Sequence, residues 1–425
     1  MKTKLTSIFA LAIMMASCSN QELIDSDFQQ PSPQQTSSIR SYEEALQIAQ
    51  ASIQMVDGQA QTRAASPRKI SLNDSKVCLG SGITRSEAEN DTLMYVFNFE
   101  DNQGFAIVSA SRNTEGLLAI TEKGCFDPNV KSEIEGFNLF IEKAKNYVRN
   151  SKYPISSRPN LRLDPILEMK DSTIIELTIV GPYLSVRWGQ SYCEGEYCDN
   201  NIAGCVNVAM AQIMSYYEYP SYIDITYPNS DISYQSLNWT NLKAHTTNHL
   251  LANCPSSDNN THKSLGRLCR QLGYLDSSTY DTNSTSTYLS NVPATFQYLG
   301  YNTTNGWTDH FNSSICTYLN SQKLSIMSGI CADGGHAWVC DGYYDRKETE
   351  CLMVRELGML FWEIHTIYSV HRSSFYHLNW GWYGCNNGYF SIGVFNTAAV
   401  YMPDTSLNYT NETFSDVQYM VVYPN

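Results

Sequence analysis

Hydrophobic and polar positions divide the first part of the chain into helices and short strands. Residues 42–55 carry apolar side chains at helical spacing after a serine suited to cap the first turn. Residues 93–99 and 105–109 are β-rich on either side of a polar, glycine-containing turn, which predicts a β-hairpin. Short strands near residues 117–120 and an amphipathic helix at residues 136–148 follow. We therefore expect a first folded unit of the α+β type.

A second pattern begins near residue 184, after a proline-containing stretch at residues 151–165 that is typical of an exposed linker. Three apolar runs at helical spacing come first, at residues 205–218, 262–274 and 286–299. Four β-rich runs come after them, at residues 326–330, 336–344, 375–380 and 389–394. This order predicts a helical lobe followed by a lobe built on a mostly antiparallel sheet.

Composition fits a globular protein with more than one folded unit. The chain has 425 residues, of which 42% are hydrophobic and only 16% are charged. Its formal net charge of −14 argues against a nucleic-acid partner, because the phosphate backbone would be repelled and no stripe of Lys and Arg offsets the charge. The charge does not identify a substrate.

The N-terminus has the pattern of an export signal. Lys2 precedes an apolar run at residues 8–15 that is far too short to span a bilayer. The run ends in small residues before Cys18, which looks like the lipidation site of a bacterial lipoprotein. We therefore expect residues 1–17 to be a lipoprotein signal peptide and residues 18–40 to be a flexible tether. The alternative is an ordinary cleaved signal in which the cysteine is incidental.

A lipid on Cys18 would make the protein membrane-anchored without spanning the membrane. The expected location is the outer membrane of a Gram-negative envelope, on either its surface or its periplasmic face, with release after processing also open. Such oxidising compartments permit disulfides among the thirteen cysteines.

Two cysteine pairs are close enough in sequence to form disulfides. Cys193 and Cys198 could pair locally, and Cys331 and Cys340 could bridge neighbouring strands, but neither connectivity follows from the sequence. Cys331, His336 and Cys340 are also zinc-ligand types. No CxxC pair accompanies them, and adjacent strand positions do not all point one way, so we expect no metal. We expect no cofactor either.

A glycine followed by a cysteine opens the helix predicted at residues 205–218. Partial positive charge at a helix N-terminus lowers the pKa of a thiol, so Cys205 is placed as a nucleophile would be. Gly204 leaves room for a substrate backbone beside it. An isolated cysteine in an apolar helix is more often a core residue, so the assignment depends on partners elsewhere in the chain.

Partners for a thiol nucleophile are present in the required order. His336 follows two glycines and can act as the base that holds the thiolate. Asn379 can orient the His336 ring, and Trp380 can shield that hydrogen bond from water. Gln190, upstream of Cys205, can donate its amide to a developing oxyanion. Each alone would be an ordinary strand, turn or core residue, but cysteine, histidine and asparagine in this order are typical of papain-like peptidases.

Three blocks together resemble the streptopain family of secreted cysteine peptidases. They are residues 203–214 around Cys205, residues 335–342 around His336, and residues 377–382, which read His-Leu-Asn-Trp-Gly-Trp. Residues 104–110 and the helix at 136–148 resemble the inhibitory propeptide of that family.

The resemblance implies a zymogen that is cleaved to give a cysteine endopeptidase acting on proteins and peptides. It implies an α+β propeptide domain at residues 41–150 that inhibits its own chain, a linker at 151–183 with the cleavage site, and a papain-like two-lobe domain at 184–425. By the same resemblance, Cys205 is the nucleophile, His336 the base and Gln190 the oxyanion donor. Asn379 and Trp380 support the histidine.

Three segments depart from the family pattern. Residues 345–374 are a long insertion that could cap the cleft or reshape specificity, and residues 281–287 replace a glycine-rich stretch of the substrate-binding wall. Tyr383 stands where the family has a glycine, and its ring could narrow access near Asn379. These departures keep two alternatives open: a silent binding or adhesion lipoprotein on the same fold, and other acyl-transfer chemistry such as amide ligation.

Overall fold

The computed structural model describes residues 38–59, 68–80, 91–151, 168–244, 259–304, 306–308, 314–331, 334–357, 362–395 and 417–425. The predicted signal peptide, Cys18 and most of the tether lie outside the described residues, as do residues 152–167 of the predicted linker. In the part of the chain that the structure describes, no helix is both long enough and apolar enough to cross a membrane.

The first folded unit is of the α+β type, as predicted, and consists of a four-stranded antiparallel meander with two helices. Its elements are α1 (Tyr42–Gln59), β1 (Ile70–Leu79), β2 (Thr92–Phe99), β3 (Phe105–Ser109), β4 (Leu117–Thr121) and α2 (Glu135–Ser151). Its first strand, β1, was not predicted. Strands β2 and β3 form the expected hairpin. Ser41 caps α1 reciprocally, because its Oγ accepts the Glu44 N–H at 3.2 Å while the Ser41 N–H donates to the Glu44 carboxylate at 2.8 Å.

The helical lobe is built around α3 (Cys205–Tyr217), which begins at the predicted residue. Its other helices are α4 (Trp239–Ala244), α5 (Asn259–Leu275) and α6 (Val292–Tyr298), with short strand pairs β6 (Tyr222–Asp224) with β7 (Tyr234–Ser236) and β8 (Thr279–Tyr280) with β9 (Thr285–Ser286). Side chains from Val206 to Ser215 are all buried, so α3 is the central helix of this lobe.

The sheet lobe contains most of the remaining strands and two short helices. They are β10 (Tyr301–Thr303), α7 (Ser314–Asn320), β11 (Leu324–Cys331), β12 (Gly334–Leu357), β13 (Trp362–Asn379), β14 (Gly388–Ser391), α8 (Ile392–Phe395) and β15 (Val417–Pro424). Residues 392–394 were expected to continue a strand and instead begin α8, which packs against α2. The predicted architecture, helices before a mostly antiparallel sheet, is confirmed.

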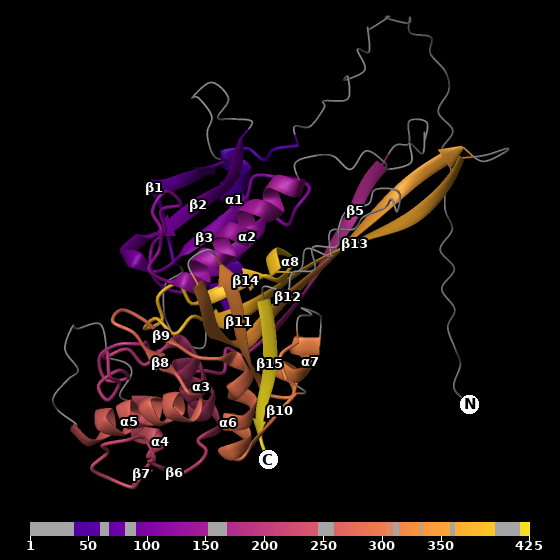
Figure 1. Ribbon diagram of the computed structural model, residues 1–425. Coiled ribbons are helices and arrows are strands. Elements are labelled where there is room, and N and C mark those ends of the chain that lie inside the picture. The colour runs from indigo at the N-terminus through magenta and orange to yellow at the C-terminus, as the bar shows by residue number, and fades with distance from the viewer. Residues whose placement is uncertain are drawn as a thin grey trace, which may run out of the picture. The chain divides into compact units, whose positions relative to one another are not determined.

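One continuous sheet joins the two folded units. Its order is β1-β2-β3-β4-β14-β13-β12-β11-β15-β10, with β5 (Glu168–Val180) paired to β12 (Figure 1). The junction is the antiparallel pairing of β4 with β14, in which Gly388 lies opposite Thr121. The first unit therefore docks by extending the sheet of the second.

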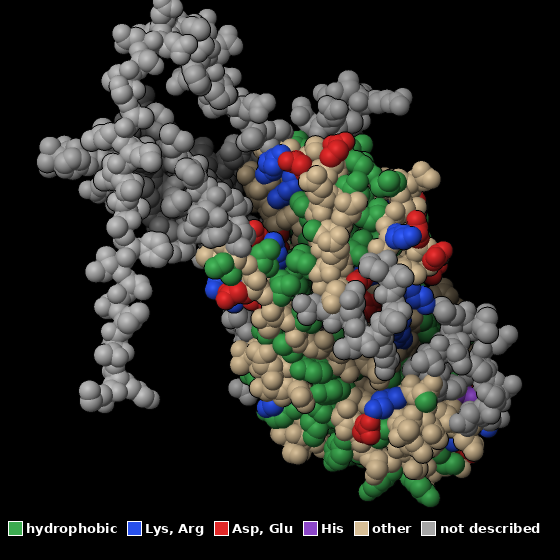
Figure 2. All heavy atoms as spheres, turned by 180° about the vertical axis from the view of Figure 1, so that it is seen from behind, with side chains coloured by type: hydrophobic (Ala, Val, Ile, Leu, Met, Phe, Trp, Pro, Cys, Tyr) green, Lys and Arg blue, Asp and Glu red, His purple; other side chains and the backbone are tan. Residues whose placement is uncertain are grey.

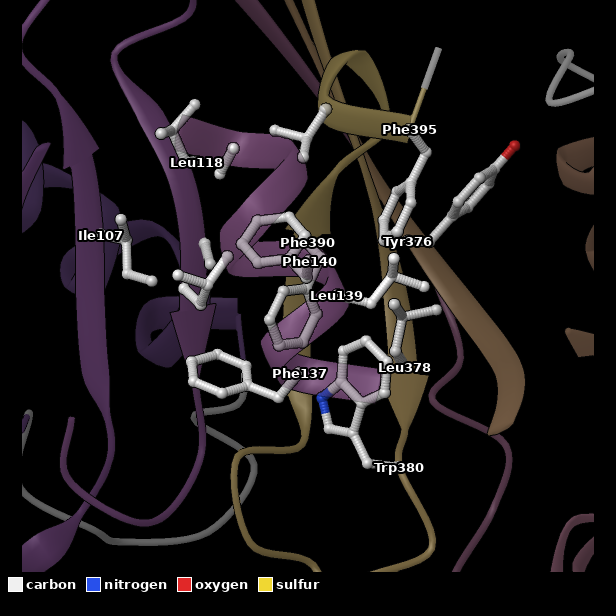
Figure 3. Packing of buried hydrophobic residues seen from close by; sticks show 14 of the residues in the cluster. Ile107, Leu118, Phe137, Leu139, Phe140, Tyr376, Leu378, Trp380, Phe390 and Phe395 are labelled. Carbon is white, nitrogen blue, oxygen red and sulfur yellow. The ribbon is translucent and has the colours of Figure 1, made fainter. Parts of the chain in front are cut away.

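Aromatic side chains of α2 seal this junction. Phe140 packs edge-on against Phe390 of β14 with ring centroids 4.8 Å apart, and Phe137 and Trp380 lie in the same cluster (Figure 3). Burying these rings on both sides of the junction stabilises the docked arrangement by roughly 1.5–3 kcal/mol per fully buried ring.

Two segments differ from their predicted form. The predicted linker contains β5, which pairs along β12 from Val180 opposite Tyr343 to Glu168 opposite Val354. The insertion at 345–374 extends β12 and β13 into one long hairpin. Together the three strands form a ribbon that runs away from α3 (Figure 1).

The insertion lies at the wrong end of β12 to cap His336. His336 is near the start of the strand, whereas Asp345, where the insertion begins, is nine residues further along it. At about 3.3 Å per residue this separation is roughly 30 Å. The expectation that the insertion caps the cleft is therefore wrong. A capped cleft was the main argument for a silent binding protein, so this alternative loses that support.

Both candidate disulfides are wrong. Cys193 is disulfide-bonded, but Cys198 and Cys340 are free thiols. The β11–β12 register explains the second case, because Cys331 lies opposite Gly334 while Cys340 lies opposite Ser325. The two cysteines are thus about six strand positions, or roughly 20 Å, apart, whereas a disulfide needs Cα atoms within about 7 Å.

Candidate active site

Cys205 is the first residue of α3, and Gly204 is the N-cap residue directly before it. Gly204 has φ of 90°, a left-handed conformation that favours glycine. A Cβ at Gly204 would also lie 2.9 Å from Thr285, so the unfamiliar segment 281–287 reaches the residue beside the thiol. The Cys205 Sγ accepts a hydrogen bond from the Ala337 N–H at 3.4 Å. Position at the N-terminus of a helix and a main-chain donor both favour a thiolate.

His336 of β12 lies beside Cys205 and is buried. Its Nε2 is 3.0 Å from the carbonyl oxygen of Trp380, which fixes the ring. Its Nδ1 is 3.4 Å from the carboxylate of Glu135, a residue of α2. Trp338, two positions further along the strand, stacks against the ring with centroids 6.2 Å apart.

The two side chains shift each other's pKa in opposite directions. Burial disfavours the Cys205 thiolate, but the adjacent His336 and the Ala337 N–H together outweigh burial and lower the pKa of the thiol. Burial likewise disfavours the charged imidazole, but Cys205, and then Glu135 and the Trp380 carbonyl, raise the pKa of His336 to about 10. The arrangement therefore favours a thiolate next to an imidazolium, which supplies both a nucleophile and a proton donor.

Asn379 and Trp380 are both buried next to this pair, in a different arrangement from the one predicted. The Asn379 side chain accepts from the Gly381 N–H at 3.1 Å and from the Gln212 amide at 3.3 Å, and it donates to the Val186 carbonyl at 3.1 Å. The histidine is held by the main chain of Trp380. The role of Asn379 in orienting the His336 ring remains a prediction.

Gln190 lies in the segment leading to Cys205, and its carbonyl accepts the Ala203 N–H at 2.6 Å. Its role as an oxyanion donor remains a prediction. Tyr383 lies close to this segment, since a Cβ added to Gly189 would be 2.2 Å from its ring.

The first unit covers the histidine from the other side. Gly136 lies so close that an added Cβ would be 2.6 Å from His336 and 2.7 Å from Trp380. Together with the Glu135 carboxylate, this contact places the start of α2 on the His336 ring. Neither residue was selected from the sequence, because nothing local in the chain shows what the first turn of α2 will face. Trp338 could have been selected, since strand alternation places it on the same face as His336.

A second acidic contact joins the two units away from Cys205. His377 is buried between Asp341, 2.6 Å from its Nδ1, and Glu122 of the first unit, 3.2 Å from its Nε2. Burial disfavours charge on both sides, but pairing with His377 lowers the pKa of Glu122, and Asp341 followed by Glu122 raises the pKa of His377 to about 10. Arg187 adds a 3.4 Å contact to Glu122.

This contact predicts a bell-shaped pH dependence of stability. Ionised Glu122 adds to the free energy of unfolding at pH values above its ordinary pKa of 4.5. This stabilisation is lost as the pH falls through the lowered pKa that Glu122 has in the folded protein. His377 contributes fully below its ordinary pKa of 6.5, and the contribution is lost as the pH rises toward about 10. In a Cys205→Ala background that blocks processing, Glu122→Gln should lower the melting temperature most between pH 4.5 and 6.5. If the difference in melting temperature between the proteins with and without Glu122→Gln is the same from pH 3 to pH 10, Glu122 and His377 do not act as a charged contact.

On the face of the molecule seen in Figure 2, positively and negatively charged side chains are mixed. Lys and Arg lie among Asp and Glu, separated by polar and hydrophobic groups (Figure 2). On this face the negative charge of the chain is therefore not gathered into one patch.

Comparison with known proteins gives matches over both units. Residues 187–390 match the Peptidase C10 family, and residues 35–148 match the Spi protease inhibitor family. Streptopain of Streptococcus pyogenes serotype M28 is 26% identical over 359 residues, covering 76% of this chain and 78% of streptopain. Thiol protease/hemagglutinin PrtT of Porphyromonas gingivalis is 22% identical over 374 residues, covering 78% of this chain and 38% of that protein.

Among solved structures, a fragment of prointerpain A from Prevotella intermedia is similar. Its TM-score is 0.47 at 17% sequence identity, and the match covers 82% of this chain and 98% of the fragment.

Proposed function

We propose a mechanism from the premise that the chain belongs to the Peptidase C10 family and is a cysteine endopeptidase with an N-terminal Spi-type propeptide domain. The Cys205 thiolate attacks the carbonyl carbon of a peptide bond, and the carbonyl oxygen becomes an oxyanion. Gln190 donates its amide N–H to that oxyanion. His336 gives its proton to the leaving amine, and it then takes a proton from the water that hydrolyses the acyl-enzyme.

The pairing of Cys205 with His336 at the start of α3 carries this proposal. The lowered pKa of Cys205 and the raised pKa of His336 supply the ion pair that the first step requires. Main-chain donation from Ala337 to the sulfur holds the thiolate in place.

In this proposal, the first turn of α2 keeps the uncleaved chain inactive. Glu135 and Gly136 occupy the side of His336 that an incoming peptide would need, so the propeptide domain blocks the site until cleavage. Cleavage falls N-terminal to β5, because β5 is paired along β12 and is retained as a strand of the mature enzyme.

The export pattern supports a lipid anchor on Cys18, with the mature site held at the outer membrane of a Gram-negative cell. Incorporation of labelled palmitate into the expressed chain, and its loss in Cys18→Ala, tests the anchor separately from the enzyme activity.

Affinity labelling tests the site assignment directly. The chain lacking residues 1–18 is incubated under reducing conditions until its mass falls to that of the processed form, and a peptidyl epoxysuccinate is then added. We expect one reagent per chain, located on Cys205 by peptide mapping, and a parallel loss of casein hydrolysis. Casein hydrolysis that persists after full labelling of Cys205, or labelling of another cysteine that stops it, would reject the assignment.

A further inference from the structure

Tyr383 packs on the main chain immediately before Gln190. It lies in a turn after Asn379, with φ of 54°, a conformation uncommon for a large side chain. Its ring occupies the space over Gly189 so closely that a Cβ there would be 2.2–2.5 Å from three ring atoms. A glycine is therefore required at position 189 as long as the tyrosine keeps this position.

The Tyr383 hydroxyl also holds the residue after Gln190. The Ser191 N–H donates to the Tyr383 Oη at 2.9 Å. One side chain thus contacts both neighbours of Gln190, through its ring on one side and its hydroxyl on the other.

Two further hydrogen bonds fix the main chain of Gly189 and Gln190. The Gly189 N–H donates to the carboxyl of Glu194 at 3.2 Å, and the Gln190 carbonyl accepts the Ala203 N–H at 2.6 Å. Glu194 is fully buried, and burial raises its pKa to about 8. The main chain around Gln190 is therefore held by the side chains of Tyr383 and Glu194 and by the main chain of Ala203.

We propose that Tyr383 is a positioning residue that fixes the main chain around Gln190, so that the Gln190 amide is aimed at the oxyanion formed on Cys205. The inference rests on the proposed role of Gln190. A donor that is aimed in advance stabilises the transition state more than the ground state.

Tyr383→Phe tests this with little change in packing. The ring stays, but the hydroxyl that accepts from the Ser191 N–H is lost. We expect kcat for a peptide substrate to fall about 10-fold with KM changed less than 2-fold, because small misplacement of a catalytic group lowers the rate without weakening substrate binding. Tyr183→Phe is the matched control, since it removes a tyrosine hydroxyl that donates to the Leu319 carbonyl at 3.1 Å elsewhere. Its kcat should stay unchanged.

A double-mutant cycle with Gln190→Ala separates the inference from the proposed function. Gln190→Ala alone should lower kcat by about 10²-fold. If Tyr383 acts through Gln190, Tyr383→Phe should have no further effect on kcat in the Gln190→Ala background. Equal effects of Tyr383→Phe in both backgrounds would overturn the positioning role while leaving Gln190 intact. An unchanged kcat in Gln190→Ala would overturn the proposed oxyanion role, and the inference with it.

A peptide aldehyde provides a second readout that a general loss of stability would not give. Its adduct with Cys205 places an oxygen where the oxyanion forms. Tyr383→Phe should lower the affinity for the peptide aldehyde about 10-fold and leave the affinity for the matching peptide alcohol unchanged. Equal weakening of both compounds would indicate a general change of the cleft and overturn the inference.

Discussion

Replacing Cys205 with alanine is expected to lower kcat/KM for peptide hydrolysis by about 10⁵-fold or more, because no other group in the site can form the acyl-enzyme. The pKa shifts of Cys205 and His336 depend on each other, so the loss of one partner also removes the ion pair. The purified chain should keep its full mass for days under reducing conditions with casein, whereas the wild type becomes shorter and degrades the casein. Intact mass spectrometry and a fluorogenic peptide assay measure both effects.

Cys316→Ala is the matched control for this variant. Cys316 is also a free, half-buried cysteine of the peptidase unit, but it lies in α7, and burial raises the pKa of its thiol to about 11. It should process and hydrolyse peptide at the wild-type rate within about 2-fold. Casein hydrolysis by purified Cys205→Ala above about one part in a thousand of the wild-type rate would place the nucleophile on another residue.

Replacing Gly136 with leucine is expected to release the inhibition by the propeptide domain. An added Cβ would already overlap His336 and Trp380 at 2.6 and 2.7 Å, and both rings are held in place by packing. Overpacking of this kind costs typically 1–3 kcal/mol, which corresponds to a weakening of the docked state of about 5- to 150-fold. The rate at which iodoacetamide alkylates Cys205 in the uncleaved chain should rise by a similar factor, and processing should begin without a lag.

Gly58→Leu is the control in the same folded unit. Gly58 lies near the end of α1, and an added Cβ there has nothing within 4 Å. Its alkylation rate and lag should match the wild type. An alkylation rate in Gly136→Leu that equals the wild-type rate, in a protein with normal stability, would mean that the start of α2 does not govern access to the thiol.

Local signals in the chain predicted much of the fold. Helix α3 begins at Cys205 as expected, since the glycine before it and the apolar run after it both act within a few residues. The β2–β3 hairpin formed where the alternating runs flank a turn. Predictions were wrong where packing between distant segments decided the outcome: α8 formed against α2, and β5 formed because β12 offered an open edge.

The sequence by itself determined the chemical groups of this protein and the order in which they occur. Cys205, His336 and Asn379, together with residues 104–110 and the helix at 136–148 that resemble a propeptide, indicate a cysteine peptidase zymogen. These features depend on residue type and chain order, which the sequence states directly.

Only the tertiary structure decided which groups contact one another. It placed Glu135 and Gly136 on His336, paired Glu122 with His377, and positioned the ring of Tyr383 over Gly189. Each of these contacts joins residues that are far apart in the chain, and each depends on the join between β4 and β14 or on the turn that follows Asn379. Such contacts arise from the register of paired strands and the packing of buried rings, and no local pattern of residues specifies either.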